Sequence, residues 1–307
     1  MGFLDRLLGR EDEADAPAEA RRDEDLARLE RGGVPLAAEQ RIRELAAGAT
    51  AFTSELSVPA FALSRLDEVR PICQVQGSSV YKVGWQSLPT GSWFSSDSIA
   101  TELRPLTEAW NTARGLALGR LGEEARLAGC HAVVGVTFDS KRHDFLSDEI
   151  EVVVHGTAVH LPERGERPVL SDLSMADFTL LRRAGYAPVG IVAATSVWYI
   201  VPSWRTQRLT TGWQRFQPNQ ELTDFTQGVY YAREMAVSRA TSDAQSLGAE
   251  GMVGVSVEED VDVRERGSDN NKREDLVVTF HVLGTAIVQR GEARPLDIRT
   301  VVRQGER

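Results

Sequence analysis

The 307-residue sequence contains few cysteines and no long apolar run. Its two cysteines, Cys73 and Cys130, are too few for the disulfide framework of a small secreted protein, so we expect a reducing, cytoplasmic environment. The first ten residues lack the apolar core and the small-residue cleavage site of a signal peptide. No stretch approaches the roughly 18 apolar residues that a membrane-spanning helix requires.

The sequence also contains fewer basic than acidic residues. The chain has 35 Lys and Arg against 45 Asp and Glu, a formal net charge of -10, which disfavours a nucleic-acid partner because phosphates are bound by a surplus of positive charge. The 42% of hydrophobic and 26% of charged residues are typical of a globular protein, and the length suggests two domains.

Catalytic motifs are missing from the sequence. No Gly-rich phosphate loop follows a predicted strand, and neither a Gly-x-Ser-x-Gly nucleophile elbow nor a His-Glu-x-x-His pair occurs. We therefore expect a protein that is not an enzyme.

The N-terminal part divides into a leader and a helical hairpin. Residues 1–25 form an acidic leader, which we expect to be disordered from residue 11 because it offers too few apolar residues to balance the entropy of ordering. The pattern of residues 26–50 predicts two short helices separated by Gly32 and Gly33. This helical hairpin is either an oligomerisation module or a pair of helices that packs on the main body of the protein. If the first ten residues are helical, they present an apolar patch that could bind a protein partner or a membrane surface, formed by Phe3, Leu4, Leu7 and Leu8.

One unit of about 110 residues occurs twice. Leu56-Ser57 recurs as Leu173-Ser174, and Gly156-Thr157-Ala158 recurs as Gly284-Thr285-Ala286. Further matches of the same kind are Pro71 with Pro188, Val80 with Val197, Ala113-Arg114 with Ala232-Arg233, Arg120 with Arg239, Gly129 with Gly248 and Val134-Gly135-Val136 with Val253-Gly254-Val255. The repeats span residues 55–161 and 172–290, and residues 291–307 form a tail.

Periodicity predicts an α+β fold in which each repeat has the order β, α, β, β. The expected strands are residues 72–83, 131–138 and 149–159 in the first repeat and 189–201, 251–257 and 276–288 in the second. Each expected helix, with apolar residues spaced by three or four positions, ends at Gly129 or Gly248. The last strand of each repeat is largely apolar on both faces, whereas one helix covers only one face of a sheet. We therefore predict a homo-oligomer.

The residues around the second and third strands carry a family resemblance. Ala113-Arg114 and the segments 123–139 and 151–159, the latter ending on Gly-Thr-Ala, resemble the bacterial YbjQ family, also described as a heavy-metal-binding domain. The resemblance implies a dodecin-like fold that assembles into rings. The turn after the helix departs from the Gly-Ala-Asp-Ala that we expect, because it reads Gly129-Cys130-His131-Ala132 in the first repeat and Gly248-Ala249-Glu250-Gly251 in the second.

Three residues of the first repeat are candidate metal ligands. If the numbers of paired residues in the second hairpin sum to about 286, His131 and His155 face each other on neighbouring strands and could bind one divalent transition metal ion. Cys130 could add a thiolate only if the turn rotates it toward them. The alternative is a pair of half-buried histidines that are hydrogen-bonded to their neighbours.

Two loops before the helices are rich in aromatic residues, which suit a subunit contact, internal packing or a small-molecule pocket. These residues are Trp85, Trp93, Phe94, Trp204, Trp213 and Phe216. A third segment, Glu258 to Asp275, is acidic but lacks the ligand spacing of a calcium loop, so we expect a solvated hairpin loop there.

Overall fold

A computed structural model describes residues 19–49, 51–84, 88, 98–143, 149–162, 167–210, 219–266 and 273–293. The chain forms two compact units, neither of which is a single stretch of sequence. Unit 1 comprises Met1–Glu55, Val69–Gln86 and Glu108–Pro168, and unit 2 comprises Leu56–Glu68, Ser87–Thr107 and Val169–Arg307. The fold is α+β, as predicted.

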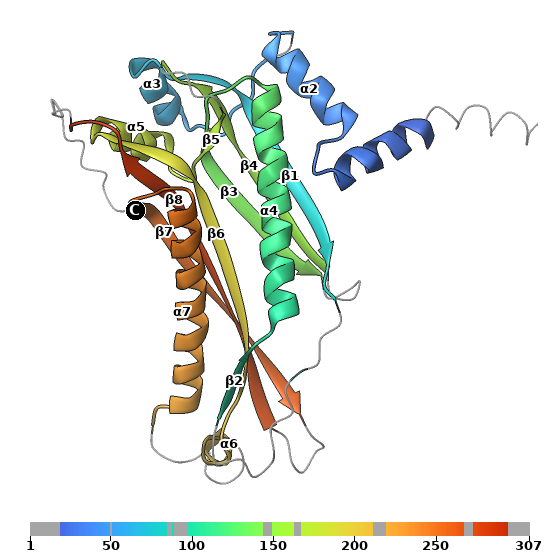
Figure 1. The fold of residues 1–307 in the computed structure, drawn as a ribbon, viewed down its shortest axis with the longest axis vertical. Coiled ribbons are helices and arrows are strands. Elements are labelled where there is room, and N and C mark those ends of the chain that lie inside the picture. Colours follow the sequence, from blue (N-terminus) through green and yellow to red (C-terminus); the bar gives the residue numbers. More distant parts are fainter. Residues whose placement is uncertain are drawn as a thin grey trace, which may run out of the picture. The chain divides into compact units, whose positions relative to one another are not determined.

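Unit 1 is an antiparallel sheet covered on one face by a helix (Figure 1). Strand β4 (Glu149–His160) lies between β1 (Arg70–Lys82) and β3 (Ala132–His143). Helix α4 (Arg104–Leu127) buries alanines and a leucine at four-residue intervals, a spacing that keeps them on one helix face. It comes close to β1 at Gly77, where a Cβ atom would lie 2.0 Å from the carbonyl oxygen of Ala117. Only glycine allows this approach.

The N-terminal hairpin also belongs to unit 1. Residues 19–30 are helical, and α2 (Leu36–Ala46) follows after Gly32, whose φ of 79° ends the first helix. The first helix therefore begins inside the leader that we expected to be disordered, in a run of good helix formers supported by an ion pair between Glu24 and Arg28. Helix α2 packs against α4 and β1 through the fully buried Ile42 and an Arg41–Glu124 ion pair of 2.9 Å.

Unit 2 contains a four-stranded antiparallel sheet in the order β2-β6-β8-β7. These strands are β2 (Ile99–Glu102), β6 (Tyr186–Val201), β7 (Gly251–Arg266) and β8 (Arg273–Gln289). Helix α7 (Thr223–Ser246) packs on β6 and β8 through four buried alanines. The unit also contains the short elements β5 (Val169–Leu170), α3 (Val58–Leu66), α5 (Met175–Arg183) and α6 (Trp204–Thr210).

The long helices end where the sequence predicts. Gly129 and Gly248 have φ values of 65° and 72°, in the left-handed region that favours glycine at the end of a helix. None of the helices in the described ranges is long and apolar enough to cross a lipid bilayer.

The acidic segment from Glu258 to Asp275 is not the solvated loop that we expected. Strand β7 continues to Arg266 and β8 begins at Arg273, so most of the segment is paired in the sheet. Asp275 is fully buried, and its carboxylate forms ion pairs with Arg266 and Arg273. Composition misled the prediction because the backbone of β7 pairs with β8 while the charged side chains of residues 258–265 remain exposed.

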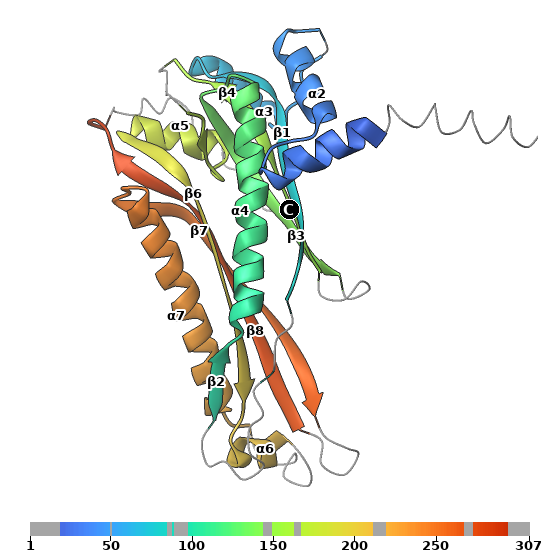
Figure 2. The ribbon, with the colours of Figure 1, turned by 45° about the vertical axis from the view of Figure 1, so that its right-hand side comes forward.

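Two stretches of the first repeat lie in unit 2. They are residues 56–68, where α3 contacts α5, and residues 87–107, where β2 pairs with β6 (Figure 2). The compact units therefore differ from the continuous domains 55–161 and 172–290 predicted from the repeat. The first repeat gives a strand to the sheet of the second.

Candidate functional site

The repeated Gly-Thr-Ala motif anchors the segment that leads into each repeat. In unit 1 the backbone N–H of Glu55 donates to the hydroxyl of Thr157, over 3.0 Å. In unit 2 the N–H of Asp172 donates to the hydroxyl of Thr285, over 3.2 Å. Asp172 stands 117 positions after Glu55, so the two contacts are equivalent. Burial is the larger influence on the Asp172 carboxyl and raises its pKa, although the bond from Thr285 opposes this.

The absence of a side chain at Gly156, the glycine of the motif, leaves space for a β-bulge in the neighbouring strand β3. A Cβ at Gly156 would lie 2.9 Å from Cγ1 of Val133 and 3.1 Å from Cγ2 of Val136. Between Val134 and Thr137 the pairing of β3 with β4 shifts, and Gly135 adopts a φ of 63°. This combination of a bulge and a left-handed glycine places the side chain of Thr137 beside His155.

His155 is the centre of a polar cluster in unit 1. Its Nδ1 donates to Oε1 of Glu55 over 2.6 Å, and its Nε2 lies 3.4 Å from Oδ2 of Asp139. The hydroxyl of Thr137 lies 3.1 Å from the ring nitrogens, and the amide of Gln74 donates to the same Glu55 oxygen. The His155 and Glu55 side chains are both about three-quarters buried.

The cluster favours the charged form of the imidazole. Burial lowers the pKa of His155, but the hydrogen bonds and charges of Glu55 and Asp139 outweigh it, and the net pKa is raised. With a carboxylate beside each ring nitrogen, the His155 ring is placed to donate one hydrogen bond from each N–H of an imidazolium. Sequence reasoning singled out His155 but missed its partners, because Glu55 lies 100 residues away in the chain.

The predicted pairing of His131 with His155 is wrong. His155 lies opposite Thr137, whereas the backbone N–H of His131 donates to the carbonyl of Val159. The His131 ring packs on His160 with ring centres 5.0 Å apart, and its Nδ1 accepts the N–H of Leu161 over 3.1 Å. His131 thus has the neighbour-bonded role that was the alternative reading.

Cys130 carries a protonated thiol rather than a reactive thiolate at neutral pH. Its thiol is buried, and burial raises its pKa to about 12. Within the described ranges, no group of three or more His, Cys, Asp or Glu side chains is arranged to hold a metal ion. Both ring nitrogens of His155 face carboxylates, an arrangement that suits hydrogen bonding within the cluster. Metal binding by His131, His155 and Cys130 stays a prediction.

The second repeat lacks the same cluster. Leu283 and Ile191 stand where the first repeat has His155 and Gln74, although Ser256 and Glu258 keep polar groups at the positions of Thr137 and Asp139. Any chemistry of His155 therefore belongs to unit 1 alone.

The donated strand β2 forms the second distinctive site. Its register with β6 pairs Ile99 with Val201 and Glu102 with Trp198. Beyond the strand, Val197 is bonded on both backbone groups: its N–H donates to the Thr107 hydroxyl over 3.0 Å, and its carbonyl accepts the N–H of Leu103 over 2.8 Å. The outer edge of β6 is therefore occupied by the first repeat.

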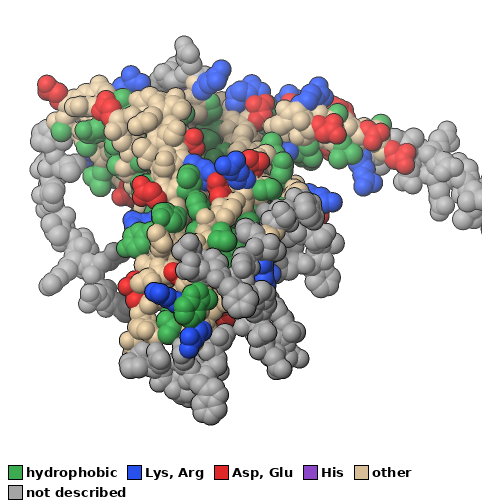
Figure 3. All heavy atoms as spheres, turned by 60° about the horizontal axis from the view of Figure 1, so that its bottom comes forward, with side chains coloured by type: hydrophobic (Ala, Val, Ile, Leu, Met, Phe, Trp, Pro, Cys, Tyr) green, Lys and Arg blue, Asp and Glu red, His purple; other side chains and the backbone are tan. Residues whose placement is uncertain are grey.

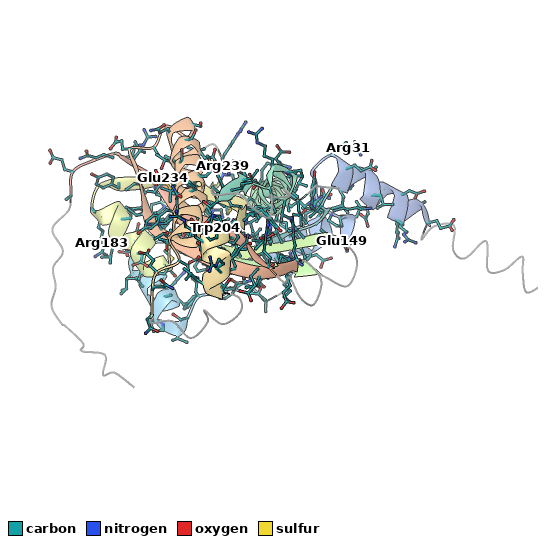
Figure 4. The ribbon with its side chains drawn as sticks, turned by 90° about the horizontal axis from the view of Figure 1, so that it is seen from below. Arg31, Glu149, Arg183, Trp204, Glu234 and Arg239 are labelled. Atoms are coloured by element: carbon teal, nitrogen blue, oxygen red, sulfur yellow. The ribbon has the colours of Figure 1, made fainter. Side chains whose placement is uncertain are left out.

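An ion pair fixes the donated strand to α7. Arg239 Nη2 lies 2.7 Å from Oε1 of Glu102, and the half-buried Arg239 side chain comes from α7 (Figure 4). The same guanidinium donates to the carbonyl of Thr195 on β6, over 3.5 Å. Arg239 thus binds the acceptor strand and the donated strand together.

Of the six loop aromatics, only Trp204 lies in the described part of the chain. It begins α6, is partly exposed, and lies beneath Arg205 and Arg208, whose guanidinium carbons are 5.9 and 5.5 Å from the ring centre. Trp85, Trp93, Phe94, Trp213 and Phe216 lie outside the described residues, as does the apolar patch of residues 1–10.

A buried charge cluster in unit 2 was not predicted from the sequence. The hydroxyl of Tyr199 donates to Asp275 over 2.6 Å, and Arg273 pairs with the other carboxylate oxygen over 2.9 Å. Burial, followed by the hydrogen bond to Asp275 and then its charge, raises the pKa of Tyr199 to about 12. Tyr199 and Asp275 belong to strands that are adjacent only in the folded sheet.

Comparisons with known proteins agree with the repeat signature. The family model described as "Putative heavy-metal-binding" (YbjQ) matches residues 92–162. The protein named encapsulin nanocompartment protein Rv1762c, of Mycobacterium tuberculosis, is 37% identical over 211 residues, which are 66% of this chain and 76% of that protein.

Two shorter relatives carry the name UPF0145 protein. The one from Thermus thermophilus is 39% identical over 69 residues, 22% of this chain and 59% of its own length. The one from Clostridium novyi is 32% identical over 97 residues, 31% of this chain and 87% of its own. No solved structure is similar to the chain at a comparable level of significance. The family model and the extent of these matches show that the chain belongs to the YbjQ (UPF0145) family.

Proposed function

We propose that this protein is a non-enzymatic scaffold of dodecin-like units whose copies assemble into a ring-like homo-oligomer. The observation that carries the proposal is a row of exposed valines on β7, the edge strand of the unit 2 sheet. Between 42% and 57% of the surface of each of these side chains is exposed, and they are Val255, Val257, Val261 and Val263.

The row continues the apolar face of the sheet. Val257 pairs with Val282 and Val261 with Val278, and these two partners are buried under α7. Soluble proteins protect an exposed edge strand with charges or a covering element, so an apolar edge favours a protein contact. The opposite face of β7 carries acidic side chains, including Asp260 and Asp262, and one acidic residue, Glu259, lies within the valine face, opposite Phe280.

Further apolar side chains reach the surface of the described part, where green hydrophobic groups lie beside charged ones (Figure 3). Tyr230 and Tyr231 of α7 are among them. The name of the Rv1762c relative, which describes a nanocompartment protein, also supports an assembly role. We propose no catalytic step, because the polar side chains around His155 bond one another rather than converge on an open position.

Sedimentation velocity of the full chain tests the proposal. We expect species larger than the 33.8 kDa chain, whose proportion falls on dilution. Val261→Lys should reduce the assembled fraction because it places a charge in the valine row. Asp260→Lys, on the opposite face of the same strand, is the matched control and should leave assembly unchanged. A wild-type protein that remains a monomer at every concentration would contradict the proposed function.

A further inference from the structure

We propose that the outer edge of β1 binds residues 219–222 of a second copy of this chain, in the way that β6 binds β2 within one chain. This inference rests on the proposed assembly function and adds to the valine row of β7 a second contact between copies, made by two different surfaces of the chain. It follows from comparing the repeats position by position. In the part of the chain that the structure describes, no strand pairs with the acceptor edge of the first repeat or with the donor segment of the second.

The two acceptor strands have the same register in their sheets. Val75 pairs with Gly156 in unit 1, and Val192 pairs with Gly284 in unit 2, 117 positions after Val75. The match continues along the strand, where Val80 of β1 corresponds to Val197 of β6. Equal register means that equivalent backbone groups point to the same side of the strand.

The edge is occupied in one unit and open in the other. Val197 directs its N–H and carbonyl to the outer edge of β6, where Thr107 and Leu103 bond both. Val80 therefore directs the same two groups to the outer edge of β1, and no strand in the described ranges pairs with that edge. The Val80 side chain is 65% exposed. An apolar residue at an open strand edge favours pairing with another chain.

The segment before α7 carries the features of the donor. Residues 100–103 read Ala-Thr-Glu-Leu and residues 219–222 read Asn-Gln-Glu-Leu, so Glu221 and Leu222 correspond to Glu102 and Leu103. Thr226 corresponds in the same way to Thr107, which supplies the hydroxyl for the acceptor strand. Leu103 and Thr107 are buried, whereas Glu221 is exposed and Leu222 and Thr226 are half-buried. Residues 221–226 therefore do not make, within the described chain, the strand contact that buries Leu103 and Thr107.

The acceptor unit also holds the matching cation. Arg120 of α4 corresponds to Arg239 of α7, and it donates to the Ser78 carbonyl as Arg239 donates to the Thr195 carbonyl. Arg239 has Glu102 of the donated strand as its acid. The Nε of Arg120 is buried without a hydrogen-bond partner among the described residues, and another of its nitrogens donates to the carbonyl of Leu29. In the proposed contact Glu221 of the second copy supplies the missing acid.

Within the described residues, each chain therefore has one acceptor edge and one donor segment that no other strand pairs with. Because these are different surfaces, the contact joins copies head to tail, and such a contact closes into a ring or extends as a filament. Two copies that exchanged donors would close the smallest ring.

Cysteine trapping tests the register directly. The Thr101–Tyr199 pair corresponds to Gln220 of one copy opposite Lys82 of the other, so the variant Lys82→Cys/Gln220→Cys should form disulfide-linked multimers under mild oxidation. Lys82→Cys/Asn219→Cys is the matched control, because neighbouring strand residues point to opposite faces. The native cysteines are buried and stay in every variant.

The outcomes separate this inference from the proposed function. Multimers from the Gln220 variant, at least fivefold more abundant than from the Asn219 variant, would support the contact. An oligomer without these cross-links, or a disulfide within one chain, would overturn the contact and leave assembly intact. A monomeric wild-type protein would overturn both.

Charge reversal gives a second, independent measurement. Arg120→Glu and Glu221→Arg should each weaken assembly at least tenfold in sedimentation velocity, and the double variant should restore most of it. If both single variants are folded by circular dichroism and assemble like the wild type, the contact is refuted.

Discussion

The close approach of α4 to β1 gives the sharpest stability prediction. In Gly77→Ala, the new Cβ would lie 2.0 Å from the Ala117 carbonyl oxygen and 2.6 Å from the Leu121 backbone nitrogen. Both atoms belong to the helix backbone, so no side-chain rotation relieves the clash. The helix must retreat by about 1 Å, which loosens buried contacts along its whole apolar face.

The expected cost follows from overpacking. Extra methylene groups in a packed core typically cost about 1–3 kcal/mol of unfolding free energy, and a clash with backbone belongs at the upper end, about 3 kcal/mol. Unit 2 offers a matched control because alanine stands at the equivalent position, Ala194, under α7. Ala194→Gly creates no clash and should cost only about 1–2 kcal/mol, from chain entropy and a lost methyl group.

Urea unfolding followed by circular dichroism measures both variants. We expect the midpoint for Gly77→Ala to fall clearly below that of Ala194→Gly, with both below the wild type. If Gly77→Ala unfolds within about 0.5 kcal/mol of the wild type, the effect is no larger than that of an ordinary surface substitution, and the close approach of α4 to β1 is refuted.

Three further predictions concern charged and polar groups. Asp275→Ala removes the acid that pairs with the buried Arg273 and the half-buried Arg266, and it should cost about 3–5 kcal/mol in urea unfolding; a loss below about 1 kcal/mol would contradict a buried ion pair. The raised pKa of His155 means that its contribution to stability is present below the unfolded pKa and is lost as the pH rises through the folded pKa. His155→Leu should therefore destabilise more at pH 5.5 than at pH 8.5, measured by thermal unfolding, and an equal effect at both pH values would contradict the charged pairing with Glu55. Thr285→Val should cost about 1–2 kcal/mol because it removes the hydroxyl that accepts the partly buried N–H of Asp172, and Thr279→Val serves as a control on the same strand; equal losses would contradict the anchor role.

The sequence predicts the elements that repeat with a clear period. The long helices and the six main strands follow from apolar spacing, and Gly129 and Gly248 mark the helix ends because a left-handed residue is needed there. These are local properties, and a single chain segment specifies each of them.

Register and partner choice are not local, and the predictions failed there. The His131–His155 pairing was wrong because no residue pattern marks the centre of the second hairpin, and the bulge at Gly135 shifts the register further. The four residues of β2 are too few to show a period, and nothing in them says which sheet they join. The Glu55–His155 contact likewise depends on how the entry segment folds back over the sheet.

Amide hydrogen exchange of the β1 edge tests the central claim most directly. In assembled full-length protein, the Val80 amide should exchange as slowly as that of Val197, and diluting the protein to monomers should expose Val80 while Val197 stays protected. Rapid exchange at Val80 in a sample that sedimentation shows to be fully assembled would contradict the claim that a second copy covers this edge.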